Sequence, residues 1–196
     1  MCIRDRGWSG ISYLSAKLCH TCIVADASGS WGCGAFEKDS LCWFQIQWPQ
    51  SWQYVNIAVK EMLPLVVGAA IWGSRWEGHR VSFLSDNLAV VNVLTARSAK
   101  DPHIMHLLRC LFFFEAHFKF EHVAQHVPGK MNTAADALSR NRSSEFHSIY
   151  PQAQQCPSSI PHPLLTMVLG PTQTWTSPSW REMFLRTLQE VCHRQP

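Results

Sequence analysis

Three short segments with strand character follow one another before the first helix of the chain. Residues 22–25 form an apolar run that ends at Asp26, as expected of a central strand buried on both faces. Residues 31–37 follow after a turn, and in residues 41–48 apolar side chains alternate with glutamines. Consecutive strands joined by short turns predict an antiparallel meander.

The rest of the domain alternates between helix and strand. A long helix is predicted over residues 57–76, with Asn56 as its N-cap and Pro64 as a kink or a mark of its early turns. Further along, the patterns predict a strand over 81–85, helices over 88–94 and 103–115, a strand around 118–121 and a short helix over 131–139. This order predicts an α/β fold with a mixed five-stranded sheet, a meander plus two parallel strands, flanked by helices.

Composition places weaker limits on function. The 196 residues suffice for one well-buried domain and a tail, and a formal net charge of +3 is compatible with nucleic acid without arguing for it. Eight cysteines without a secretory signal predict reduced thiols in an intracellular protein. Cys19 and Cys22 have zinc-like spacing, but no second pair of ligands follows, so no zinc site is predicted. No apolar run reaches the length of a membrane span.

Four acids lie where these elements would bring them together. Asp26 and Asp86 end two strands, Glu61 lies near the N-terminal end of the long helix, and Asp136 lies among alanines in the last helix. An acid among small apolar residues is costly to bury unless something neutralises it. Hard oxygen ligands in this number suit two Mg²⁺ or Mn²⁺ ions, which about 4 Å apart can activate a water and stabilise the leaving oxygen of a phosphodiester.

Each acid also has an ordinary structural interpretation. Asp26 could be a turn residue, Asp86 a helix cap and Glu61 a solvated helix residue. Asp136 could pair with Arg140, four residues further on. No acid is convincing alone, so the argument rests on their order along this succession of elements.

The order of elements and the motifs around the acids resemble the ribonuclease H fold. The matching motifs are residues 24–28, 32–35, 60–63, 84–87, 127–132 and 135–140. The last of them, Ala135-Asp136-Ala137-Leu138-Ser139-Arg140, resembles the ribonuclease H end of retrotransposon polymerases. Residues 70–73 and 107–113 are similar to the DIRS-like branch of these retroelements.

This resemblance implies the ribonuclease H domain of a DIRS-like retrotransposon reverse transcriptase. The four acids would bind two Mg²⁺ or Mn²⁺ ions and cut the RNA strand of an RNA–DNA hybrid. Ser28 and Asn87 would hydrogen-bond the nucleic-acid backbone, although a turn residue and a helix cap are equally good interpretations. The expected partners are the hybrid and the polymerase portion of the same polyprotein, with no membrane, and the expected location is the replication complex in the cytoplasm or nucleus.

The resemblance covers residues 20–142, which sets the expected domain, and residues 1–19 would be a remnant of the connection from the polymerase. Residues 143–178 are rich in Pro, Ser and Gln and are predicted to be a linker that does not pack on the domain. Residues 179–196 are predicted to form a short helix that begins a truncated following region. In the DIRS-like branch that region is a tyrosine recombinase.

Two features depart from the family pattern. Many ribonucleases H carry a His in a loop shortly before the last acid, where this chain has Lys130, and His126 is expected to end a strand away from the reacting phosphate. Loss of a general acid–base helper lowers a rate by roughly 10²–10⁴-fold without abolishing metal-assisted cleavage. The basic protrusion with which some relatives grip the hybrid is not evident between Arg97 and His103.

Two other functions fit the same fold. The first is a catalytically silent module that binds nucleic acid or braces a polymerase, against which the presence of all four acids argues. The second is a resolvase or integrase that acts on DNA alone, against which the Asp136-Ala137-Leu138-Ser139-Arg140 ending argues.

Overall fold

The predicted meander forms one half of a five-stranded sheet. In the computed structural model, which describes residues 21–170, 177, 182–184, 186, 187, 189 and 190, the strands are β1 (Cys22–Ala27), β2 (Gly32–Glu37), β3 (Trp43–Gln47), β4 (Arg80–Ser85) and β5 (Glu121–His126). Their order in the sheet is β3-β2-β1-β4-β5. The first three pair antiparallel, whereas β4 pairs parallel with both β1 and β5. The predicted mixed α/β fold is confirmed.

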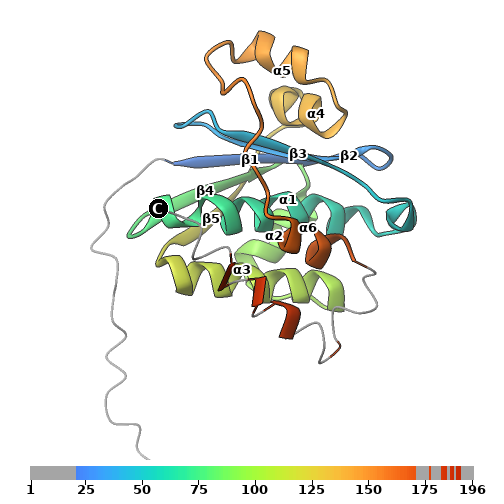
Figure 1. The fold of residues 1–196 in the computed structure, drawn as a ribbon, viewed down its shortest axis with the longest axis vertical. Coiled ribbons are helices and arrows are strands. Elements are labelled where there is room, and N and C mark those ends of the chain that lie inside the picture. The colour runs from blue at the N-terminus through green and yellow to red at the C-terminus, as the bar shows by residue number, and fades with distance from the viewer. Residues whose placement is uncertain (1–20, 171–176, 178–181, 185, 188, 191–196) are drawn as a thin grey trace, which may run out of the picture.

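The helices divide between the two faces of the sheet. They are α1 (Ile57–Trp72), α2 (Leu88–Ala96), α3 (Pro102–Phe118), α4 (Thr133–Ser139), α5 (Ser143–Ile149) and α6 (His162–Leu169). Three short 3-10 turns are η1 (Gln50–Trp52), η2 (Gly73–Trp76) and η3 (Gly129–Met131). Figure 1 shows α4 and α5 on one face and α1, α2 and α3 on the other, with α6 beside the second layer.

Each face of the sheet buries its own core. Ile23 and Ala25 of β1 belong to the core under α1 and α3, whereas Val24 belongs to the core under α4 and α5. This explains why β1 is apolar at every position up to Asp26. Helix α1 continues through Pro64. Among the described residues, Ile57–Trp76 is the one helical stretch long and apolar enough to cross a membrane, and 78% of its most apolar window is buried in this core.

The fifth strand lies later than the sequence pattern predicted. Residues 118–121 were expected to form it, but Phe118 is the last residue of α3 and β5 begins at Glu121. Lys119 adopts the left-handed conformation (φ 55°) and its N–H donates to the carbonyl of Glu115, which ends the helix. The alternation of Phe118 and Phe120 with charged residues therefore marks a helix end and a connection rather than a strand.

The predicted linker instead packs on the domain, so that prediction is wrong for the described part of residues 143–178. Phe146 of α5 is fully buried and contacts Phe36 and Trp43 at ring-centroid distances of 5.5 Å. On the other face, Leu164 and Met167 of α6 are buried in the core under α1.

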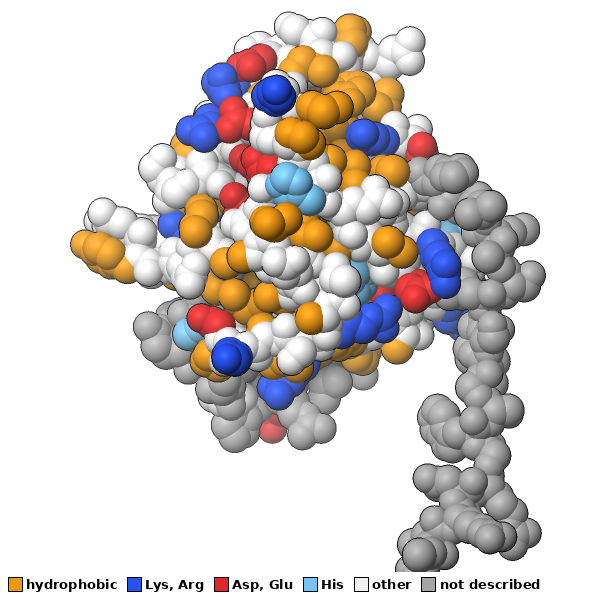
Figure 2. Space-filling model, turned by 180° about the vertical axis from the view of Figure 1, so that it is seen from behind, with side chains coloured by type: hydrophobic (Ala, Val, Ile, Leu, Met, Phe, Trp, Pro, Cys, Tyr) orange, Lys and Arg blue, Asp and Glu red, His pale blue; other side chains and the backbone are white. Residues whose placement is uncertain are grey.

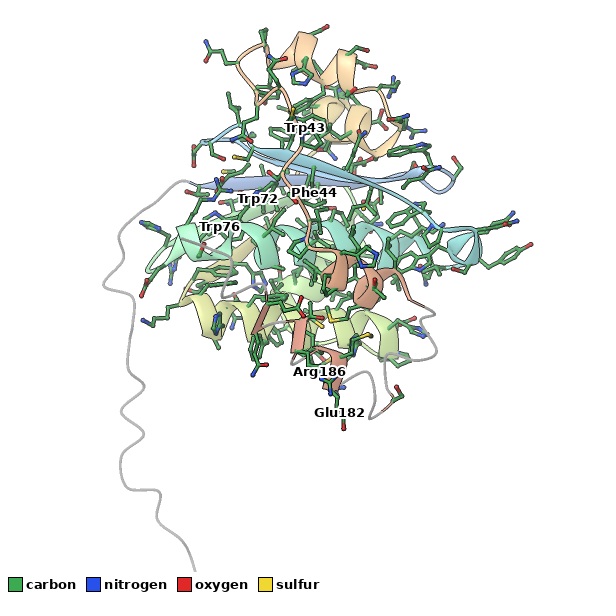
Figure 3. All side chains as sticks on the ribbon, in the orientation of Figure 1. Trp43, Phe44, Trp72, Trp76, Glu182 and Arg186 are labelled. Carbon is green, nitrogen blue, oxygen red and sulfur yellow. The ribbon has the colours of Figure 1, made fainter. Side chains whose placement is uncertain are left out.

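Polar groups of the domain bind this same segment. The indole N–H of Trp43 donates to the carbonyl of Gln154 (2.7 Å), and the indole N–H of Trp52 donates to the carbonyl of Leu169 (3.0 Å). The backbone N–H of Ser158 donates to the carbonyl of Trp43 in the edge strand β3 (2.7 Å). The proline-rich segment thus covers a sheet edge and supplies acceptors for two indole N–H groups of the domain. Figure 3 shows Trp43 and Trp72 among the side chains that it covers.

The predicted helix near the C-terminus is described only in part. Residues 182–184, 186, 187, 189 and 190 are helical, and the ring of Phe184 lies 5.5 Å from that of Phe113. Residues 1–19, with Cys19 of the predicted zinc-like pair, lie outside the described residues. Within residues 21–170, Cys33, Cys42, Cys110 and Cys156 form no disulfide.

Candidate metal centre

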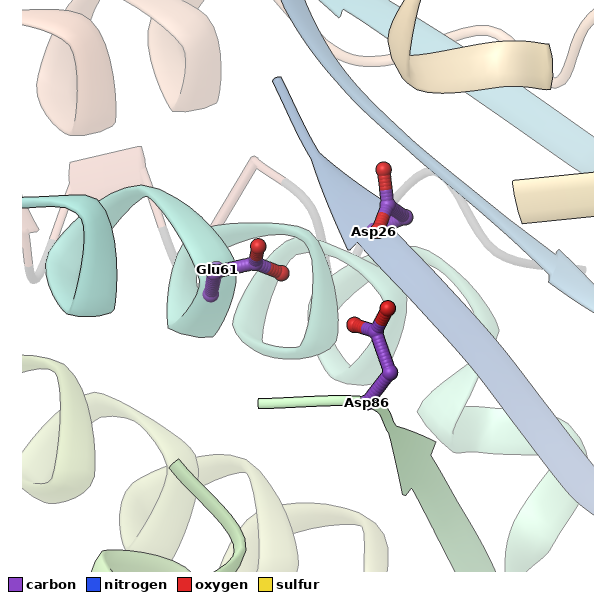
Figure 4. Close-up of side chains that lie close together, drawn as sticks. All are labelled: Asp26, Glu61 and Asp86. Carbon is purple, nitrogen blue, oxygen red and sulfur yellow. The ribbon is translucent and has the colours of Figure 1, made fainter. Parts of the chain in front are cut away.

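Three carboxylates from three elements meet at one edge of the sheet (Figure 4). Asp26 lies near the end of β1, Asp86 directly follows β4, and Glu61 lies in the second turn of α1. One oxygen atom from each carboxylate lies within 4.8 Å of the other two. Asp26 and Glu61 are only 6% and 7% exposed, whereas Asp86 is half-buried. The structure therefore brings together three of the four acids that the sequence pointed to.

The register of the sheet explains this meeting. In the parallel pair of β1 and β4, Val24 lies beside Leu84, and continuing that register by two residues places Asp26 beside Asp86. The carboxyl ends of neighbouring parallel strands share one edge, which is where an open α/β sheet places its sites. Helix α1 packs on β1 and β2 and has Glu61, in its N-terminal half, at this edge. Its start is fixed by Asn56, whose side chain accepts from the N–H of Ala58.

Burial and mutual repulsion raise the pKa values of Asp26 and Glu61, which disfavours the simultaneous ionisation of the cluster. Burial, with smaller contributions from Asp26 and Asp86, raises the pKa of Glu61 from 4.5 to about 9. Burial, followed by the repulsion of Asp86 and Asp136, raises the pKa of Asp26 to about 6, against the lowering effect of a hydrogen bond from Ser139. Such a cluster is stable in fully ionised form only when positive charge enters it.

A divalent cation fits this donor set. The Oε2 atom of Glu61 is buried and has no hydrogen-bond partner, although a buried carboxylate oxygen normally has one. Its neighbours are two further carboxylates, and carboxylate oxygens are the ligands that Mg²⁺ and Mn²⁺ prefer. Asp26, Glu61 and Asp86 are therefore the residues that would hold such an ion.

Asp136, the fourth predicted acid, faces two arginines instead of the cluster. Its Oδ1 atom lies 2.6 Å from Nε of Arg140, and its Oδ2 atom accepts from Nη2 of Arg142. The ion pair with Arg140 is the alternative that the sequence left open. Asp136 is still near enough to raise the pKa of Asp26, so it stands at the rim of the cluster.

Helix α4 also supplies a contact that the sequence did not predict. The hydroxyl of Ser139 donates to Oδ2 of Asp26 and is fully buried. This contact depends on Gly34, the β2 partner of Asp26, because a Cβ atom at position 34 would lie 2.4 Å from Cβ of Leu138. Only a residue without a side chain lets α4 approach so closely. The Ala-Asp-Ala-Leu-Ser spacing was the available signal, since Ser139 follows Asp136 by about one helical turn.

The two predicted substrate-binding residues have structural tasks. Ser28 is 3% exposed, and its hydroxyl accepts from the N–H groups of Trp31 and Gly32 (both 3.0 Å) in the turn between β1 and β2. For Ser28 the structure shows the turn interpretation, and the predicted contact with nucleic acid stays a prediction. The Oδ1 atom of Asn87 caps α2 by accepting from the N–H groups of Ala89 and Val90. For Asn87 the structure shows the helix-cap interpretation, and a contact with nucleic acid stays a proposal.

His126 lies closer to the site than the sequence suggested. It ends β5 as expected, but its Nε2 atom lies 3.2 Å from the backbone carbonyl oxygen of Asp86, and the side chain is exposed. It thus lies beside the backbone of one of the three acids, and its expected distance from the reacting phosphate stays a prediction. Its position follows from the register of β4 and β5, in which Ser85 pairs with His126. Gly129 closes the same corner, because a Cβ atom there would lie 3.0 Å from Oδ2 of Asp86.

The chain matches solved structures, but it matches neither a protein-family model nor a curated protein. Among solved structures, LC11-RNase H1, isolated from compost, aligns with a TM-score of 0.50 and 18% identity over 64% of this chain and 96% of its own.

Two further ribonuclease H structures align less well. The N-terminal RNase H domain of a Mycobacterium tuberculosis protein gives a TM-score of 0.49 at 21% identity, covering 67% of this chain and 98% of that one. LC11-RNase H1 in complex with an RNA/DNA hybrid gives 0.48 at 15% identity, covering 64% and 96%. The β3-β2-β1-β4-β5 order, with helices on both faces, gives this chain a ribonuclease H-like fold.

Proposed function

We propose that the chain is a metal-dependent ribonuclease H that hydrolyses the RNA strand of RNA–DNA hybrids. The observation that carries this proposal is the cluster of Asp26, Glu61 and Asp86 at the carboxyl edge of β1 and β4, with an unpartnered buried oxygen on Glu61. Such an arrangement is costly without a cation. The ribonuclease H-like fold supports the choice of reaction.

Each residue has a task in this proposal. Asp26, Glu61 and Asp86 hold the cations, and Ser139 orients the Asp26 carboxylate through its hydroxyl. Two divalent cations, when bound, supply an activated water and stabilise the leaving oxygen of the phosphodiester. The low exposure of Asp26 and Glu61 keeps bulk water from competing, while half-buried Asp86 leaves the site accessible to a large substrate.

We further propose that the domain comes from a DIRS-like retroelement reverse transcriptase and works within its replication complex inside the cell, beside the polymerase portion. The support is the sequence resemblance of residues 135–140, together with the fold.

The test is a cleavage panel with the full chain. Four substrates of one sequence, RNA–DNA hybrid, double-stranded RNA, double-stranded DNA and single-stranded RNA, are incubated with Mg²⁺, Mn²⁺ or chelator. The proposal expects cleavage of the RNA strand of the hybrid only, in either metal and not in chelator. Cleavage of duplex DNA alone would favour a resolvase or integrase, and equal cleavage of both RNA substrates would refute hybrid specificity.

One observation favours the silent module as a second candidate. The ion pairs of Asp136 with Arg140 and Arg142 leave three carboxylates in the cluster instead of four. A silent module would bind the hybrid, seen as a change in fluorescence anisotropy, and cleave none of the four substrates in either metal.

A further inference from the structure

Two guanidinium groups surround the carboxylate of Asp136. Arg140, one helical turn further along, pairs with Oδ1 through Nε at 2.6 Å, and Arg142 pairs with Oδ2 through Nη2. This charge-assisted contact on each oxygen uses the atoms with which a carboxylate would bind a metal. Asp136 is one-third exposed, so the pairs lie at the solvent side of the cluster.

The second arginine is held by the segment that had been predicted to be a linker. Nη1 of Arg142 lies 2.7 Å from Oε2 of Glu145, in the first turn of α5, while Nη2 serves Asp136. The guanidinium is thus shared between two carboxylates, and α5 is anchored in turn by buried Phe146. The position of Arg142 is therefore a property of the folded tail.

We propose that Arg140 and Arg142 are positioning residues that compete with a divalent cation for Asp136. In the cation-free protein they hold this carboxylate at the rim, and the cation must displace them to gain a fourth carboxylate ligand. This inference rests on the proposed metal site. The inference adds that Arg140 and Arg142 weaken metal binding at that site through their ion pairs with Asp136.

The size of the effect follows from exposure. The side chains of Arg140 and Arg142 are 54% and 44% exposed, so each ion pair is weakened by solvent. Exposed pairs of this kind change an equilibrium by about fivefold at most, and two that share one acceptor by about tenfold together. Replacing both arginines should therefore tighten metal binding by up to roughly tenfold.

The experiment measures the affinity for Mn²⁺ by calorimetric titration of the metal into the full chain, without nucleic acid. It compares the wild type, Arg140→Gln/Arg142→Gln, Asp136→Asn, and the triple variant that combines all three changes. Arg80→Gln is the matched control for loss of one positive charge. Arg80 is equally exposed (52%) and ion-paired, but it begins β4, at the opposite end of that strand from Asp86. Circular dichroism confirms that each variant is folded.

The proposal expects tighter Mn²⁺ binding in the double arginine variant, no change in Arg80→Gln, and no further gain when the arginines are replaced in the Asp136→Asn background. An equal gain in that background would overturn it, because the arginines would then act by general repulsion. Unchanged or weaker affinity, or no Mn²⁺ binding in any variant, would also overturn it. Failure of hybrid cleavage with the affinity pattern intact would refute only the proposed function.

Discussion

Replacing Glu61 by Gln should stabilise the cation-free protein, although Glu61 is central to the proposed site. The raised pKa of about 9, against an ordinary value of 4.5, means that the folded protein binds a proton that the unfolded chain has released. The resulting penalty is absent below pH 4.5, grows as the pH rises towards 9 and is constant above. At pH 7 it reaches up to about 3 kcal/mol, because each pH unit is worth about 1.4 kcal/mol. Glutamine has no proton to lose.

The assay is urea denaturation in chelator between pH 5 and pH 9. Wild type should lose stability relative to Glu61→Gln as the pH rises, and the difference should be largest near pH 9. Glu77→Gln serves as the control, because Glu77 is an exposed carboxylate whose pKa is lowered by Lys119. In excess Mg²⁺ at pH 7 the wild type should become the more stable protein, since only the wild type retains the Glu61 carboxylate as a metal ligand. A stability difference independent of pH would refute this account of the cluster.

Two further substitutions test the packing around the site. Phe146→Ala should lower the free energy of unfolding by about 3–5 kcal/mol in urea denaturation, because the ring is fully buried. Ile149→Ala, on the same helix but 41% exposed, should lower it by about 1 kcal/mol or less. Equal small effects of the two changes would mean that α5 does not pack as described. Ser139→Ala should raise the pKa of Asp26 from about 6 by roughly one further pH unit, because it removes the hydrogen bond from the Ser139 hydroxyl. Carbon NMR of the Asp26 carboxyl group measures this pKa. An unchanged titration would contradict the proposed effect of that hydrogen bond.

The centre of the site could be predicted from the sequence, because Asp26 and Asp86 lie at the ends of strands. Asp26 and Asp86 follow apolar runs that must be neighbouring buried strands, and parallel strands bring their carboxyl ends to one edge. Glu61 was open to a solvated interpretation, because the sequence does not show that the first turns of α1 are covered. The structure buries it, and that burial raises its pKa.

The rim of the site could not be predicted, because it depends on tertiary contacts. Arg140 lies one helical turn from Asp136, so its ion pair could be foreseen. Arg142 lies beyond the end of α4 and is held by Glu145 of α5, a helix that composition assigned to a linker. His126 was correctly placed at a strand end, but its contact with Asp86 follows from the register of β4 and β5, which no local pattern reveals.

The tail was misjudged for a physical reason. Prolines and few apolar residues indicate a segment that cannot form a core of its own. This segment instead contributes to the two cores of the domain, since Met167 is buried in one and Phe146 in the other. The indole N–H groups of Trp43 and Trp52 find acceptors there, at Gln154 and Leu169. A buried indole needs such an acceptor, but the sequence does not show which distant carbonyl provides it.

The most direct test of the central claim is single-turnover cleavage of an RNA–DNA hybrid in Mg²⁺ by the wild type and by Asp86→Asn. Asp86 is the most exposed member of the cluster, so its replacement by an isosteric amide should leave the fold intact while removing a cation ligand. The account predicts cleavage by the wild type that chelator abolishes, and a rate at least about 100-fold lower for Asp86→Asn at the same Mg²⁺ concentration. Equal rates for the two proteins, or cleavage that persists in chelator, would contradict it.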